Sequence, residues 1–318
     1  MTREKSVQTL NIAHRGGARL WPENTLLAFQ KSIACGADGI EFDMQVSRDG
    51  DIIIHHDADL NPALTRRDGA YLRRPTPRID ALTWDELQQY DIGRPDPKSA
   101  YAQKLATDFE AADNQRIMRL SDIDALVAET AKDDFRLYAE LKTDMGANAN
   151  QAKTLSTAYG DALRHLACAA AHIAVSFDWR CLTHLRALHP DMAHAYTTLP
   201  FSSTDPTHES AAHEPPDSSR ARLRAASKAG AAWWDGFDWR DMAGATHGEK
   251  VLRAIHAADG QGWFAYWRDI DEETMGLAQD LGLRVSAWTV NEPADMKRLT
   301  RLGVDALITD RPDILKTL

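Results

Sequence analysis

Two acidic residues share one face of a predicted strand, which raises the possibility of metal chemistry. In "GIEFDMQV", residues 39–46, side chains alternate between the two faces of an extended chain, so Glu41 and Asp43 lie on the same face. On a sheet with one face in water, such acids would simply be solvated. Inside a parallel barrel both faces are covered, and neighbouring buried acids then need protons or a cation for neutralisation. A hard divalent cation is the simplest solution.

A third acid lies in a second apolar segment, "RLYAELK", residues 136–142. By the same alternation, Glu140 and Lys142 share a face, and Glu140 can complete an oxygen-rich metal site. A lysine beside a carboxylate-bound metal is expected where an anionic substrate enters between them. The structural alternative is an internal ion pair between Glu140 and Lys142.

Two histidines stand at the ends of predicted strands. His14 ends the first apolar segment and is followed by Arg15 and two glycines, whereas His56 ends "DIIIHH". In α/β barrels the carboxyl ends of the strands carry the active site. A single histidine there is often structural, but two of them beside three acids and an arginine indicate acid–base chemistry. His55 points the other way by alternation, so we expect it to have a packing or supporting role.

The sequence around these residues predicts repeated βα units, which would position them. The chain has 318 residues, of which 43% are hydrophobic, and this is enough for one large domain over residues 1–318, although the length alone also allows two. Short apolar segments mostly alternate with helix-like stretches, which predicts a closed (β/α)₈ TIM barrel. Eight such segments occur: "LNIAH", "GIEFDMQV", "DIIIHH", "RLYAELK", "HIAVSF", "AHAYTT", "RVSAWTV" and "DALITD".

Two stretches interrupt the alternation. Residues 58–120 contain five prolines and only one brief helical pattern, so we predict an inserted subdomain after the third strand, over one end of the barrel. Residues 199–223 are rich in Ser, Pro and His and lack apolar periodicity, which predicts a mobile loop, either passive or acting as a lid.

The composition excludes several classes of partner. Acidic residues outnumber basic ones by 47 to 37, so the net charge of −10 repels phosphate backbones, and nucleic acid is not an expected partner. The three cysteines show neither a disulfide framework nor a zinc-binding pattern. No apolar run approaches about 18 residues, so we expect no stable membrane insertion. A cytoplasmic location is expected, or a periplasmic or secreted one if a signal peptide has been removed. The oligomeric state stays open.

The motifs resemble those of a known family. "AHRGGARLWPENT", "GIEFDMQVSRDGDIIIHHD" and "AELK" are similar to the HRG, PENT, EFD, HD and E-x-K signatures of glycerophosphodiester phosphodiesterases, and "SAWTVN" and "LITDRPD" resemble their closing strands. The resemblance spans residues 10–313. It implies a barrel of the phosphatidylinositol phospholipase C type with an insertion where the proline-rich stretch lies. Many members continue as HDxTLDRTT, whereas this chain has "HDADLNPALTRRDG", which puts the insertion's substrate contacts in question.

The resemblance also implies roles for the candidate residues. Glu41, Asp43 and Glu140 would bind one divalent metal ion, Mg²⁺ or Ca²⁺, with Mn²⁺ as a further candidate. His14 and His56 would act as general acid and base, in an order that the sequence leaves open.

The expected reaction is the hydrolysis of small-molecule glycerophosphodiesters to glycerol 3-phosphate and an alcohol. The resemblance implies that Arg15 and Lys142 hold the phosphate. Trp288 could pack against glycerol carbon atoms or simply fill the core. A phospholipase D acting on lysophospholipids is the alternative, with "WFAYW" at 263–267 as its candidate apolar surface. A non-catalytic phosphate-binding barrel would lack catalytic groups, and none is missing here. The head group, and the choice between direct water attack and a cyclic phosphate, stay open.

Overall fold

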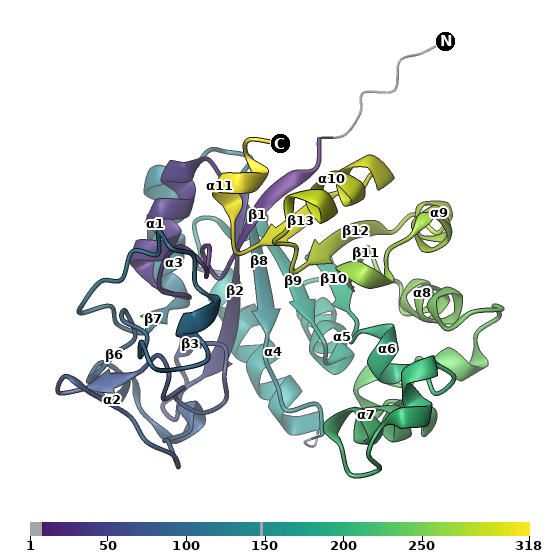
Figure 1. Ribbon diagram of the computed structural model, residues 1–318, viewed down its shortest axis with the longest axis horizontal. Helices are drawn as coiled ribbons and strands as arrows, with labels where there is room; N and C mark the ends of the chain where they lie inside the picture. Colours follow the sequence, from purple (N-terminus) through teal and green to yellow (C-terminus); the bar gives the residue numbers. More distant parts are fainter. Residues whose placement is uncertain (1–7, 147–148) are drawn as a thin grey trace.

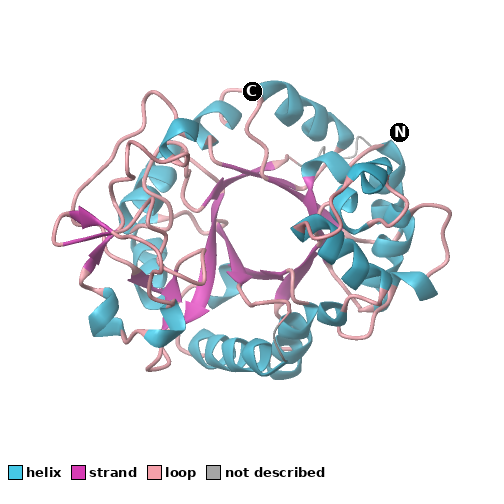
Figure 2. Ribbon diagram, turned by 60° about the horizontal axis from the view of Figure 1, so that its bottom comes forward, coloured by secondary structure: helices cyan, strands magenta, loops and turns pink. Residues whose placement is uncertain are grey.

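A closed ring of parallel strands forms the centre of the molecule, as predicted (Figure 2). The computed structural model describes residues 8–146 and 149–318. The first barrel strand pairs in parallel with both the last and the second barrel strand, which closes the ring. The barrel strands are β1 (Leu10–His14), β2 (Gly39–Val46), β8 (Arg136–Leu141), β9 (His172–Ser176), β10 (Ala193–Thr197), β11 (Gly262–Tyr266), β12 (Arg284–Trp288) and β13 (Ala306–Thr309).

Helices surround the ring and cover the outer face of its strands (Figures 1 and 2). The longer ones are α1 (Leu26–Cys35), α3 (Leu120–Thr130), α4 (Ala149–Leu163), α5 (Trp179–Leu188), α7 (Ser219–Lys228), α8 (His247–Ala257), α9 (Glu272–Asp280) and α10 (Pro293–Leu302), and the short α11 (Pro312–Leu315) follows β13. Helix α1 illustrates their local origin. The hydroxyl of Thr25 accepts a hydrogen bond from the backbone of Ala28, and Gly36 ends the helix in the left-handed conformation.

The alternation of side chains along the strands separates two apolar regions. Outward-facing residues such as Ala13, Phe42 and Leu137 pack against the helices. Residues that face the barrel axis, among them Tyr138 and Phe264, form a smaller internal cluster. The interior is therefore a packed core rather than a pore.

One predicted barrel strand was wrong, and one barrel strand was missed. Strand β3 (Ile52–Ile54), from "DIIIHH", is not in the ring, because it forms an antiparallel hairpin with β2 and then pairs with β7 (Met118–Arg119). The remaining barrel strand is β11, which contains most of the "WFAYW" segment that we considered as an exposed surface. Its Trp263 and Ala265 are fully buried and belong to the core between the ring and the helices.

The insertion 58–120 lies beside the barrel next to β2 (Figure 1). It contains a three-stranded antiparallel sheet and its own apolar cluster, which includes Leu60 and Leu87. Since β3 is outside the ring, the insertion follows the second barrel strand rather than a third one. Its elements are β4 (Arg66–Arg67), β5 (Ala70–Tyr71), η1 (Ile79–Ala81), α2 (Trp84–Leu87), β6 (Tyr90–Asp91) and η2 (Ala102–Lys104).

The segment 199–223 is more regular than the mobile loop predicted for it. It contains α6 (Phe201–Thr204), η4 (Glu209–His213) and the start of α7 (Ser219–Lys228). The buried Arg224 donates hydrogen bonds to Glu214 and Ser210, so polar contacts organise the segment without apolar periodicity. The remaining short helices are η3 (Ala169–Ala171), η5 (Ala232–Trp234), η6 (Trp239–Asp241) and η7 (Trp267–Asp269).

Two expectations from composition concern the cysteines and membrane insertion. The three cysteines are unpaired, and Cys181 is buried. Within the described ranges, no helix is both long enough and apolar enough to cross a bilayer.

Candidate active site

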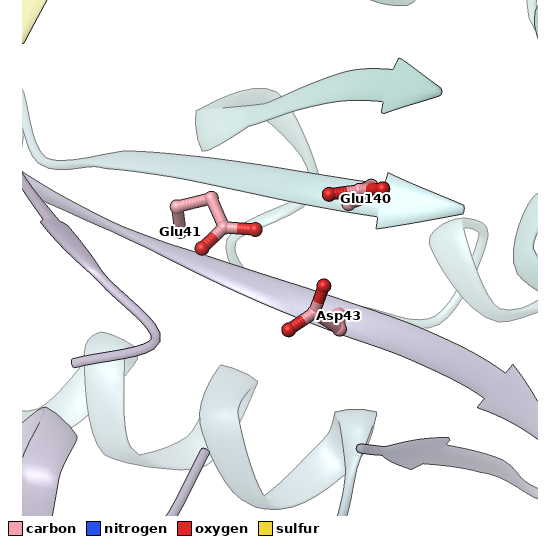
Figure 3. Close-up of side chains that lie close together, drawn as sticks. All are labelled: Glu41, Asp43 and Glu140. Atoms are coloured by element: carbon pink, nitrogen blue, oxygen red, sulfur yellow. The ribbon is translucent and has the colours of Figure 1, made fainter. Parts of the chain in front are cut away.

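Three carboxylates converge inside the carboxyl end of the barrel (Figure 3). Strand β2 supplies Glu41 and Asp43, and the adjacent β8 supplies Glu140, which stands opposite Asp43 in the strand register. One oxygen from each carboxylate lies within 4.8 Å of the others. The three residues are 1%, 0% and 7% exposed. The arrangement predicted from the alternation of side chains is therefore present.

Two cations compensate part of this negative charge. The Nε atom of Arg15 is 3.2 Å from Asp43 Oδ2, and Lys142 Nζ is 2.9 Å from Glu140 Oε1 and 3.7 Å from Asp43 Oδ1. The ion pair that we considered as an alternative for Lys142 is therefore present, but it belongs to the larger cluster. Burial acts to raise the pKa of Asp43, but the charges of Arg15 and Lys142 outweigh it and hold that pKa well below its usual value.

The second acid of β2 is not neutralised in this way. Burial and the neighbouring charge of Asp43 raise the pKa of Glu41 to about 8, although the backbone amide of Arg15 donates a hydrogen bond to Glu41 Oε2 at 3.1 Å. Arg15 and Lys142 pair with the side chains of Asp43 and Glu140 rather than with that of Glu41, which agrees with the raised pKa of Glu41.

The donor set fits a hard divalent cation. All three side chains offer carboxylate oxygens, the ligands that Mg²⁺ and Ca²⁺ prefer. Asp43 Oδ1 is buried and accepts no hydrogen bond, although the other oxygen of this carboxylate accepts one from Asn24 Nδ2 at 2.9 Å. A buried carboxylate oxygen without a hydrogen-bond donor is costly unless a cation contacts it, and Lys142 Nζ stands 3.7 Å from this atom, beyond hydrogen-bond distance.

His14 is held by a carboxylate from the other end of the chain. Its Nδ1 atom is 2.6 Å from Asp310 Oδ1, and Asn291 Nδ2 donates a hydrogen bond to Asp310 Oδ2 at 2.7 Å. The opposite ring nitrogen, Nε2, is 3.8 Å from Glu41 Oε2. Burial and the charge of Arg15 act to lower the pKa of His14, but the charge and hydrogen bond of Asp310, with a smaller contribution from Glu41, outweigh them, so the pKa lies above its usual value.

His56 has a similar carboxylate partner. Its Nδ1 atom is 2.7 Å from Asp57 Oδ1, and Asn61 Nδ2 donates a hydrogen bond to Asp57 Oδ2 at 2.8 Å. The hydrogen bond with His56 lowers the pKa of Asp57 to about 2. By contrast, His55 is buried, its ring contacts the backbone oxygen of Asp57, and burial lowers its pKa.

Aromatic rings occupy another part of the carboxyl end. Trp288 ends β12, its Nε1 atom donates a hydrogen bond to the backbone oxygen of Phe264, and its ring centre is 5.5 Å from those of Phe177 and Tyr266. A cavity of about 180 Å³ opens beside Phe177 and Lys142. Apolar surface therefore adjoins the charged cluster.

Sequence reasoning did not assign roles to Asp310 and Asn291. Both stand in the motifs "LITDRPD" and "SAWTVN", just after the last two barrel strands. Polar residues that directly follow a barrel strand are a usable signal, because the carboxyl ends of all strands meet at one face.

Comparisons with known proteins identify a family for the chain. The model of the "Glycerophosphoryl diester phosphodiesterase family" matches residues 14–314. A glycerophosphodiester phosphodiesterase from Caldanaerobacter subterraneus subsp. tengcongensis is 23% identical over 98% of both chains.

Solved structures show the same fold. A candidate glycerophosphoryl diester phosphodiesterase from Silicibacter pomeroyi DSS-3 has a TM-score of 0.80 and 27% identity, covering 98% of this chain and 92% of that one. An Oleispira antarctica phosphodiesterase in complex with the product sn-glycerol-3-phosphate has a TM-score of 0.66 and 19% identity, covering 98% and 96%. Because the family model matches nearly the whole length of the chain, the chain belongs to the glycerophosphoryl diester phosphodiesterase family and is a phosphoric diester hydrolase.

Proposed function

We propose that this enzyme hydrolyses glycerophosphodiesters to glycerol 3-phosphate and an alcohol, with one divalent metal ion, Mg²⁺ or Ca²⁺, and two histidines as general acid and base. The observation that carries the proposal is the three-carboxylate cluster, flanked by two histidines that each contact an aspartate. The product complex of the Oleispira antarctica relative supports glycerol 3-phosphate as the product.

The phosphate would bind between the cationic side chains and the carboxylates. A phosphodiester monoanion repels nucleophiles, so its oxygens need positive charge that becomes more effective as the transition state forms. Arg15 and Lys142 would supply part of that charge. A divalent cation held by Glu41, Asp43 and Glu140 would stabilise further negative charge on the phosphoryl oxygens.

The two histidines would move the protons. In each, a carboxylate contacts Nδ1 and leaves Nε2 for the substrate, since His14 contacts Asp310 and His56 contacts Asp57. One imidazole would deprotonate the attacking water or substrate hydroxyl, and the other would protonate the departing alkoxide. Each proton transfer contributes about 10² to 10⁴-fold to the rate in typical enzymes. Either histidine can be the acid and the other the base in this proposal. Direct attack by water and passage through a cyclic phosphate are both compatible with it.

We further propose that residues 1–318 form one catalytic domain in which the insertion 58–120 selects substrates. In support, the insertion hydrogen bonds to the loop after β1, where Ala106 N donates to Arg19 O at 3.0 Å and Glu110 N donates to Leu20 O at 2.9 Å. That loop leaves the carboxyl end of the barrel. Trp288, at the same end, would pack against the glycerol carbon atoms.

The lysophospholipase alternative loses most of the apolar surface that favoured it. Trp263, Phe264 and Ala265 are buried in β11, and only Tyr266 and Trp267 of this segment are partly exposed. Small water-soluble diesters are therefore the preferred substrates in this proposal.

The test is hydrolysis by chelator-treated enzyme with and without added Mg²⁺, Ca²⁺ or Mn²⁺. Glycerophosphocholine, lysophosphatidylcholine and bis(p-nitrophenyl) phosphate are compared, and glycerol 3-phosphate is quantified. We expect a metal to restore hydrolysis of glycerophosphocholine. Full activity with no bound metal would exclude the metal mechanism, and hydrolysis confined to lysophosphatidylcholine would overturn the substrate assignment.

A further inference from the structure

A tyrosine of the insertion is linked to the phosphate-binding end of the barrel. The hydroxyl of Tyr101 donates a hydrogen bond to Glu23 Oε2 at 2.6 Å, and Arg15 Nη1 donates one to Glu23 Oε1 at 3.0 Å. On its other side, Arg15 pairs with Asp43. A continuous series of polar contacts therefore runs from the insertion to the carboxylate cluster.

We propose that Tyr101 and Glu23 are positioning residues that hold the guanidinium of Arg15 toward the substrate phosphate, so that the insertion contributes to the rate of the chemical step. This inference rests on the proposed function, in which Arg15 stabilises charge on the phosphate.

The two oxygens of Glu23 explain why the tyrosine matters. Glu23 is 9% exposed, and one carboxylate oxygen contacts Arg15 while the other accepts the hydroxyl of Tyr101. Without that hydroxyl, the second oxygen would lose a charge-assisted hydrogen bond and become free to bind the guanidinium at two points. Such a two-point pair would draw Arg15 away from Asp43.

The phenol is suited to act as a permanent donor. Burial and the neighbouring charge of Glu23 raise the pKa of Tyr101 well above its usual value, so the hydroxyl keeps its proton at neutral pH. The backbone hydrogen bonds from Ala106 and Glu110 to the loop after β1 hold this part of the insertion against the barrel.

The backbone of Arg15 adds to the constraint. Its φ is 50°, in the left-handed region. A residue other than glycine keeps this unfavourable conformation only when contacts with its surroundings hold it there. Its amide donates to Glu41, and its carbonyl accepts from the amide of Asn24 at 3.0 Å. Backbone and side chain are thus held separately, and Tyr101 acts on the side chain alone.

The first experiment compares Tyr101→Phe with Tyr71→Phe. Tyr71 is a matched control, because it also lies in the insertion, and its hydroxyl donates one hydrogen bond that stays within the insertion, to Pro95 O at 3.0 Å. With glycerophosphocholine and saturating metal, we expect Tyr101→Phe to lower kcat about tenfold with a smaller change in KM, since a lost interaction of about 1.4 kcal/mol in the transition state gives this factor. Tyr71→Phe should stay within about twofold of the wild type.

A double-mutant cycle tests whether the tyrosine acts through the arginine. In an Arg15→Lys background, Tyr101→Phe should have almost no further effect on kcat/KM. An equal loss in both backgrounds, a wild-type kcat/KM for Tyr101→Phe, or an equal loss in Tyr71→Phe would each overturn the inference. If thermal unfolding shows that the Tyr101→Phe protein is not folded, Glu23→Gln replaces it in the same cycle.

A binding measurement separates failure of this inference from failure of the proposed function. Calorimetry with inorganic phosphate needs no turnover, so it remains informative if glycerophosphocholine is not a substrate. Tyr101→Phe should bind phosphate several-fold more weakly than Tyr71→Phe, and equal affinities would count against the positioning role.

Discussion

Metal binding should displace a proton from Glu41. In the metal-free protein, burial and the charge of Asp43 raise the pKa of Glu41 to about 8, whereas a metal ligand must be ionised. The proton and the metal therefore compete for this side chain. His14, Glu140 and Arg15 surround the same carboxyl group and contribute to its pKa.

The size of the effect follows from that pKa. Competition multiplies the apparent dissociation constant by 1 + 10^(pKa − pH), which is about 100 at pH 6 and about 2 at pH 8 for a pKa of about 8. The affinity for Mg²⁺ should therefore increase about fiftyfold between these pH values. The number of protons released should fall from about one at pH 6 to about one half at pH 8.

Isothermal titration calorimetry of chelator-treated protein measures both quantities. Titrations in two buffers with different ionisation enthalpies yield the number of protons released. The control is Glu41→Gln, which removes the titrating group and should bind the metal more weakly and without this pH dependence. Equal affinity at both pH values with no proton release would refute the reasoning, and release that persists in Glu41→Gln would assign the proton to His14.

The same proton affects the stability of the metal-free protein. Unfolded Glu41 ionises near its ordinary pKa of 4.5, whereas the folded protein keeps the proton until about pH 8. Between these values the folded state binds more protons, so this group makes the free energy of unfolding fall as pH rises. Thermal unfolding at pH 5 and pH 8 should show that loss, and saturating metal should reduce it.

Further predictions concern single side chains. His14→Ala and His56→Ala should each lower kcat at least about 100-fold while metal affinity from calorimetry stays within a few-fold. His55→Ala should keep most of the activity in the same assay, and finding it essential would contradict the assignment of faces around β3. Asp310→Asn should lower kcat and shift the limb of the pH–rate profile that belongs to His14 toward lower pH, because Asp310 raises the pKa of that histidine. Glu140→Gln should weaken metal binding at least about tenfold by calorimetry, since it preserves shape but removes one ligand charge.

The inward-facing acids were predictable because strand geometry is local. In β2, the apolar Phe42 and Met44 face the helices, and this places Glu41 and Asp43 on the barrel axis. A slip of one residue would bury the acids among the helices and expose the apolar side chains to the site. Binary alternation therefore leaves one acceptable arrangement.

The misassigned strand, β3, lacked that information. "III" in β3 is uniformly apolar, so its pattern does not distinguish a barrel strand from a hairpin arm. The better signal was the turn before it, where Gly50 has a φ of 94° and Ser47 N donates to Asp51 O at 2.9 Å. A short turn that contains Asp-Gly favours antiparallel pairing with the preceding strand, which removes β3 from a parallel ring.

Two residues from distant parts of the chain support the site, and only one of them could have been predicted from the fold. Closure of the ring aligns β1 with β13 and pairs Ala13 with Thr309, so His14 and Asp310 must end neighbouring strands. That these two residues lie near each other could have been inferred from closure of the ring. Nothing comparable determines Tyr101, because the path of the insertion depends on its own turns and apolar cluster rather than on barrel symmetry. A residue that tunes the site from outside the barrel is therefore recognisable only once the insertion is seen packed against the loop that carries Arg15.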